Sequence, residues 1–249
     1  ATAMSTVLLP VFSSHAARAD HQQIRATMNY ALRTLLFVMA PASIGLLCLA
    51  EPIVRMLFQW GHFTNASTVL TARALTFYAP GLFVFCLAKV FVPAFYALQD
   101  TRTPVRIGLI SVVLNFSLNV AFILTWPLEW KHAGLALATV ISEGFNGLTL
   151  ACFIHRKLGS PGWRQILASV LRASAAAVVM GICTMMCQAW LYRVGSTLLL
   201  PKLNQIVSVL VSIGVGLIVY LLCALALRCP EIHNVLQALK KRKSSPQGS

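Results

Sequence analysis

Long apolar stretches alternate with short polar ones along most of this chain. Six of the apolar stretches come close to the ~20 residues that a helix needs to cross the hydrocarbon core of a bilayer. They predict six transmembrane helices, at 30–50, 74–98, 105–126, 133–154, 168–192 and 204–227. The predicted fold is therefore an all-α integral membrane protein, a polytopic helical bundle forming one lobe from residue 30 to residue 227.

The two ends of the chain and one loop have patterns of their own. Residues 1–13 are apolar but too short to span, and we expect them to be the end of a truncated transmembrane helix. Residues 14–29 are expected to form a cytoplasmic loop and residues 228–249 a basic cytoplasmic tail. Glu51–Phe63 has apolar residues at helical spacing after a proline, which predicts a short amphipathic helix on the outer surface. On these expectations the chain lacks an amino-terminal lobe of the same protein.

Composition excludes several classes of protein. The chain is 58% hydrophobic and 10% charged, whereas soluble domains carry roughly 25% charged residues, so an ordinary soluble enzyme and a disordered chain are both excluded. The net charge of +14 comes from Lys and Arg spread thinly between apolar stretches, which is typical of membrane loops and does not predict a nucleic-acid partner. The seven cysteines show no disulfide framework and no zinc spacing.

The distribution of basic residues predicts the orientation. Of the twenty Lys and Arg, fourteen fall on one side of the predicted membrane, five on the other and one, Lys89, inside a span. The five are Arg55, Arg73, Lys131, Arg193 and Lys202. Because short cytoplasmic loops retain positive charge, the carboxy terminus is predicted to be cytoplasmic.

Two charged residues lie near the middle of predicted spans. Lys89 and Glu143 each carry an insertion cost on the order of 3 kcal/mol, so each needs a physical reason. One interpretation is that they neutralise each other, or pair with Asn residues, and only hold the bundle together. The other is that they line a polar cavity through which a charged or strongly polar substrate moves, and we favour it because stability alone would be served by apolar residues.

Prolines and amides surround these charges. Pro80 and Pro93 are predicted to break or bend the span that carries Lys89, as in the discontinuous helices of transporters. Asn115 and Asn119 lie on one face of the next span, and Asn146 lies beside Glu143. All three are candidate cavity residues, although Asn115 and Asn119 are also suited to hydrogen bonds between helices.

The last two spans contain no charge at mid-depth. Small residues repeat in them at four-residue spacing, which lets helix backbones approach closely. These residues are Ala173, Ala177 and Gly181 in one span and Ser208, Ser212 and Gly216 in the other. The pair is either a packing element or a wall that offers an apolar surface to a lipid chain.

Four segments share one resemblance. They are Lys89–Val105, which includes the turn Gln99–Pro104, together with Thr6–Pro10, Leu57–Thr64 and His132–Leu137. These segments are similar to the MurJ (MviN) family of bacterial lipid II flippases. The resemblance implies a protein of two lobes in the bacterial inner membrane. The resemblance also implies that such a protein moves a peptidoglycan precursor linked to undecaprenyl pyrophosphate to the outer leaflet by alternating access. It also implies roles for Lys89 and for Asp100 and Arg102 in the cytoplasmic turn, and an apolar groove for the lipid tail in the last two helices.

Two other functions fit parts of the pattern. One is a drug or polysaccharide-lipid exporter of the same superfamily. The other is a polytopic enzyme acting on a prenyl phosphate, which would need acids, histidines or a nucleophile clustered at one membrane surface. The six acidic residues and six histidines are instead scattered over different segments, so we expect no catalytic residue, no metal and no cofactor.

Overall fold

The computed structural model describes residues 2–59, 64–195 and 200–232, and in these ranges the chain is helical without strands. In chain order the helices are α1 (Thr2–Ala17), α2 (His21–Phe58), α3 (Asn65–Tyr78), α4 (Gly81–Ala97), α5 (Arg102–Thr125), the 3₁₀ helix η1 (Leu128–Trp130), α6 (Lys131–Leu158), α7 (Trp163–Gly195) and α8 (Pro201–Ala226). Five helices in the described ranges are long and apolar enough to span a membrane, or six if α3 and α4 form one bent span. The all-α membrane fold is therefore confirmed.

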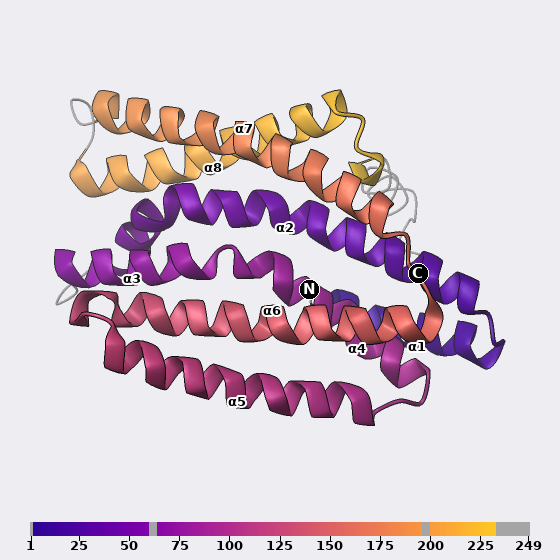
Figure 1. The fold of residues 1–249 in the computed structure, drawn as a ribbon. Coiled ribbons are helices and arrows are strands. Elements are labelled where there is room, and N and C mark those ends of the chain that lie inside the picture. Colours follow the sequence, from indigo (N-terminus) through magenta and orange to yellow (C-terminus); the bar gives the residue numbers. More distant parts are fainter. Residues whose placement is uncertain (1, 60–63, 196–199, 233–249) are drawn as a thin grey trace, which may run out of the picture.

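The helices form an extended bundle with α2 near its middle (Figure 1). At one edge α7 packs against both α8 and α2. On its other side α2 contacts α3 and α4, which pack against α6, and α5 covers the outer face of α6. The helix α1 packs against α4 and α2. As a result α2 contributes side chains to three apolar clusters. The first includes residues of α1, α4 and α6, the second includes residues of α7 and α8, and the third joins Ala50 and Val54 of α2 to Ala72 of α3.

The long helix α2 differs from the sequence prediction. It starts after Asp20, whose side chain accepts a hydrogen bond from the Gln23 backbone N–H at 3.0 Å, and continues without interruption to Phe58. Residues 21–29, expected in a loop, are therefore helical, and so is the part of the predicted surface helix from residue 51 to residue 58. The first turns of α2 are polar in composition, so hydropathy did not identify them as part of a span. Ile24, Met28 and Ala31 nevertheless recur at helical spacing and are fully buried.

The predicted span at 74–98 is divided into two helices. Helix α3 ends at Tyr78 and α4 begins at Gly81, and the two helices are bent by 48°. Pro80, which has no backbone N–H, lies in the break. The buried Ser43 hydroxyl of α2 donates a hydrogen bond to the Ala79 carbonyl at 2.8 Å. A side chain of α2 therefore satisfies a backbone carbonyl at the break between α3 and α4. Pro93 lies inside α4, which continues past it to Ala97.

The remaining predicted spans correspond closely to α5, α6, α7 and α8, which extend a few residues beyond most predicted ends. The expected loop at 14–29 is reduced to Arg18–Asp20, with Ala19 at φ 53°. Of the predicted basic tail, residues 233–249 lie outside the described residues.

Candidate functional site: a polar cavity between α4 and α6

Glycines on α6 bring this helix close to α4. A Cβ atom added at Gly147 would lie 2.8 Å from Leu87 Cβ and 3.3 Å from the Val84 carbonyl oxygen. One at Gly144 would lie 3.8 Å from Val84. Because no side chain separates the helices there, α4 and α6 pack almost backbone to backbone. This contact fixes the relative positions of the polar residues on the same two helices.

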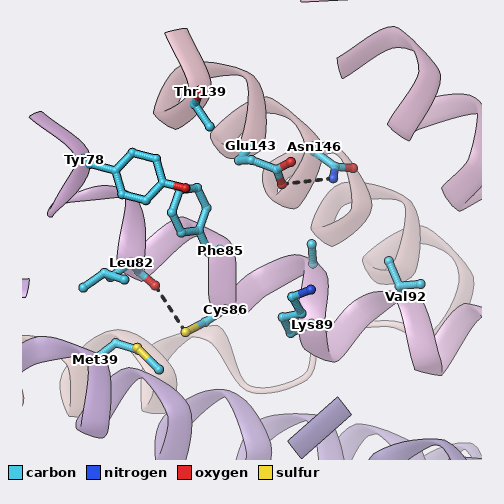
Figure 2. Close-up of a pocket in the computed structure, with 11 residues that line it drawn as sticks. Met39, Tyr78, Leu82, Phe85, Cys86, Lys89, Val92, Thr139, Glu143 and Asn146 are labelled. Carbon is cyan, nitrogen blue, oxygen red and sulfur yellow. Dashed lines mark hydrogen bonds between the residues drawn. The ribbon is translucent and has the colours of Figure 1, made fainter. Parts of the chain in front are cut away.

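A cavity of about 590 Å³ opens beside this contact (Figure 2). Its polar lining comes mainly from two helices: Lys89 lies on α4, whereas Glu143 and Asn146 lie on α6. The other lining residues are Met39 of α2, Tyr78 of α3, Leu82, Phe85, Cys86, Ala88 and Val92 of α4, and Thr139 of α6. The two charges predicted near mid-span thus line the same cavity, together with Asn146.

Lys89 and Glu143 do not pair with each other. Among the described residues the ion pairs join other groups, and neither of these two charges takes part in one. Glu143 accepts a long hydrogen bond of 3.4 Å from Asn146 Nδ2. Asn146 Oδ1 is buried and has no hydrogen-bond partner. In this conformation, therefore, mutual neutralisation does not account for the two charges.

Asn115 and Asn119 lie outside the cavity, in the interface of α5 with α6. Asn119 Nδ2 donates to Asn115 Oδ1 at 2.9 Å, and Asn115 Nδ2 donates to Ser142 Oγ at 3.1 Å and to Thr139 Oγ1 at 3.4 Å. Asn115 therefore makes the expected hydrogen bonds between helices, whereas the bond from Asn119 to Asn115 lies within α5. Thr139 is the one residue that belongs to both this network and the cavity lining.

Asp100 and Arg102 belong to the turn from α4 to α5, away from the cavity lining. Asp100 Oδ1 accepts a hydrogen bond from the Thr103 backbone N–H at 3.1 Å, and its Oδ2 lies 2.8 Å from Lys157 Nζ at the end of α6. The hydrogen bond from Lys157, followed by those from Thr103, lowers the pKa of the Asp100 carboxyl. Arg102 is exposed at the start of α5. The turn thus ties α4 and α5 to α6.

Sequence reasoning did not name the other residues of the cavity lining, among them the polar Tyr78 and Cys86. A signal for Cys86 was available, since it lies four residues after Leu82 and three before Lys89 and so shares one face of α4 with them. No such signal exists for Tyr78, because the break at Pro80 changes the direction of the helix between it and Lys89.

A second cavity, of about 440 Å³, is formed by α2, α7 and α8. Its lining is almost entirely apolar and consists of Val38, Pro41, Ala42, Gly45, Leu46, Leu49, Ile53, Met180, Thr184, Ile213, Gly216, Leu217, Tyr220 and Leu221. We call it the apolar groove. Gly216, one of the small residues noted in the sequence, lies where an added Cβ would be 2.5 Å from Thr184 Oγ1. Small residues therefore serve close packing of α8 on α7 as well as the groove.

Within the part of the chain that the structure describes, no group of three or more His, Cys, Asp or Glu residues is placed to hold a metal ion. The chemistry available in the cavity is that of one ammonium, one carboxylate and neutral polar groups. Such a set can bind and orient a polar molecule.

Comparisons with known proteins agree on one family. A family model described as lipid II flippase MurJ matches residues 1–204. The chain is 35% identical over 178 residues to the probable lipid II flippase MurJ of Vibrio cholerae, covering 72% of this chain and 33% of that protein. It is 34% identical over 184 residues to the lipid II flippase MurJ of Burkholderia cenocepacia, covering 72% of this chain and 34% of that one.

A solved structure agrees with the fold. The structure of lipid II flippase MurJ in an inward closed conformation superimposes with a TM-score of 0.68 at 24% identity, covering 90% of this chain and 42% of that chain. The chain spans about a third of the length of the two curated relatives named above. With a family model matching most of its residues and relatives above 30% identity, this chain belongs to the lipid II flippase MurJ family.

Proposed function

We propose that this chain forms part of a flippase that moves lipid II across the bacterial inner membrane by alternating access. The observation that carries the proposal is the cavity between α4 and α6, which Lys89 and Glu143 line without forming an ion pair in the described part of the chain. Charges at membrane depth are expensive and commonly mark the path of a polar substrate. Membership of the MurJ family supplies the class of substrate, since its curated members are named lipid II flippases.

The polar cavity and the apolar groove suit different parts of a lipid-linked substrate. The polar head group of a lipid-linked precursor needs a hydrated path, which the polar cavity offers, and Lys89 attracts its anionic groups, either the pyrophosphate or peptide carboxylates. The prenyl tail needs an apolar surface, which the groove of α2, α7 and α8 offers. Translocation then requires two conformations with different access and no covalent step, so the protein acts as a transporter and not as an enzyme.

The surroundings of the protein follow from the same proposal. The membrane is the bacterial inner membrane, which the chain crosses several times with its carboxy terminus in the cytoplasm. The partners are the lipid-linked substrate and membrane lipids. An amino-terminal lobe of the same protein encloses the polar cavity from the other side, and this agrees with the exposure of Lys89 here.

The proposal is tested by replacing the cavity ammonium in the full-length protein. Lys89→Met removes the charge but keeps an unbranched side chain, so outward movement of lipid II should be lost while membrane insertion is retained. Lys131→Met, at the start of α6 and outside the cavity, is the matched control and should retain movement. The measurement is the amount of lipid II reaching the outer leaflet. Unchanged movement in Lys89→Met would refute the proposed role of the cavity.

A further inference from the structure

The polar cavity carries one positive and one negative side chain in the described part of its wall, so these two charges sum to zero. Lys89 and Glu143 lie on facing helices, line the same space and form no ion pair. A charge at membrane depth that has no oppositely charged partner is best solvated by water or by a ligand. Two opposite charges held apart in this way are complementary to a molecule that also carries both.

We propose that this cavity binds the zwitterionic peptide portion of the lipid-linked precursor, with Lys89 facing a carboxylate and Glu143 facing an ammonium. This inference rests on the proposed function and specifies which part of the substrate the cavity recognises. The cavity volume of about 590 Å³ lies within the range of ~300–1,000 Å³ that is usual for ligand pockets, so a short peptide segment has room in it.

The wall of the cavity formed by α6 carries the carboxylate of Glu143. Its one hydrogen bond from a side chain, donated by Asn146 Nδ2, is long at 3.4 Å. An ammonium has three N–H donors and no acceptor, so it can donate to this carboxylate. A bare anion has no donor to offer it.

The charges also argue against the pyrophosphate as the group bound here. Phosphate groups are typically held by several cations or by backbone N–H groups at a helix N-terminus. Lys89 is the one basic residue in the described lining, and Glu143 repels an anion in the same space. A peptide with both charges is attracted at each end, and it gains two favourable interactions where pyrophosphate gains one and meets a repulsion.

The test compares two substrates in full-length protein reconstituted into phospholipid vesicles. One is lipid II with a free amine on its peptide, and the other is the same lipid acetylated on that amine, which removes the positive charge. For the wild-type protein we expect translocation of the native lipid to be about tenfold faster, because a charge-assisted hydrogen bond is lost on acetylation. In Glu143→Gln the ratio of the two rates should fall close to one.

Two further variants keep the test decisive. Asn146→Ala should lower the ratio by a smaller factor, and it provides a second reading if Glu143→Gln fails to insert. Glu129→Gln, on the exposed turn between α5 and α6, should keep the wild-type ratio. Equal wild-type rates for the two lipids, or an unchanged ratio in Glu143→Gln, would overturn the inference while the proposed function stands. If wild-type protein moved neither lipid, the proposed function itself would fail.

Discussion

Glu143 and Glu231 are both carboxylates among apolar residues, but the groups that face them differ. Glu231 is 2% exposed, and its Oε1 accepts hydrogen bonds from Arg33 Nε at 2.7 Å and from Ser169 Oγ at 2.8 Å. Glu143 has one long hydrogen bond and a cavity in front of it. A buried charge without an oppositely charged partner is costly. Glu231, which has such a partner, is therefore suited to holding helices together, whereas Glu143, which has none, is suited to binding a ligand.

Removal of the Glu231 carboxylate should destabilise the protein strongly. Glu231→Ala leaves the Arg33 guanidinium without its partner at a site where the Arg33 side chain is 24% exposed, and the expected loss is about 3–5 kcal/mol. The matched control is Glu129→Ala, since Glu129 is 78% exposed and lies 3.8 Å from Arg73, and a loss of about 0–1 kcal/mol is expected there. Unfolding free energies in mixed micelles measure both, and equal losses would contradict the assignment.

At this scale the sequence reveals unusual residues but not their partners. Lys89 and Glu143 are conspicuous because each interrupts an apolar stretch, whereas the cavity that they share becomes visible only in the structure. Glu231 looks like a solvated acid near the end of the chain, since Arg33 is 198 residues away. Ser43 is equally inconspicuous, because its role depends on a carbonyl that only the folded bundle brings near it.

Single helices were predicted well where hydropathy alone determines them. The ends of α5 lie within a few residues of the predicted span 105–126, because apolar side chains there are bounded by turn residues on both sides. The ends of α2 were not predicted, since Pro52 was interpreted as a helix start and lies instead in the interior of the helix. Membrane helices tolerate such prolines because neighbouring groups can satisfy the freed backbone.

The close contact of α4 with α6 yields a prediction at the scale of elements. Gly147→Ala places a methyl group 2.8 Å from Leu87 Cβ, an atom next to the backbone that cannot rotate away, so the helices must separate. The expected cost is about 1–3 kcal/mol of stability. Gly108→Ala, in α5, is the matched control because nothing lies within 4 Å of the new methyl group, and its higher helix propensity should leave stability equal or raised.

Thermal unfolding of the two glycine variants in the same detergent gives the comparison. A lower midpoint for Gly147→Ala together with an unchanged or higher one for Gly108→Ala is expected. If both variants unfolded like the wild type, the distance between Leu87 and Gly147 would not limit the packing of α4 on α6, and the glycines of α6 would need another explanation.

In the whole molecule, α2 lies between the polar cavity and the apolar groove. The polar cavity is lined from α2, α3, α4 and α6, and the apolar groove from α2, α7 and α8, so α2 is the one helix that lines both. A substrate with a polar head and an apolar tail has a matching surface on each side of this helix. The arrangement could not be derived from the sequence, because it depends on which of several apolar helices lie next to each other.

The orientation of the bundle is the last prediction, and it follows from charge and length together. Helix α6 has 28 residues and is about 42 Å long, more than the ~30 Å of the hydrocarbon core, so its two ends must reach opposite sides of the membrane. Arg156 and Lys157 lie at its carboxyl end, and basic residues favour the cytoplasmic side. Ser160, in the loop after α6, should therefore be cytoplasmic, and Leu128, in η1 before it, should lie outside.

A cysteine introduced at each position reports the side directly. In full-length protein whose native cysteines are replaced by serine or alanine, Leu128→Cys should react with a membrane-impermeant maleimide in intact spheroplasts. Ser160→Cys should react only after the membrane is opened. Both sites are exposed in the structure, so reactivity depends on the side of the membrane and not on burial. The reverse pattern would place the carboxy terminus outside and would require lipid II to meet the polar cavity from the opposite leaflet.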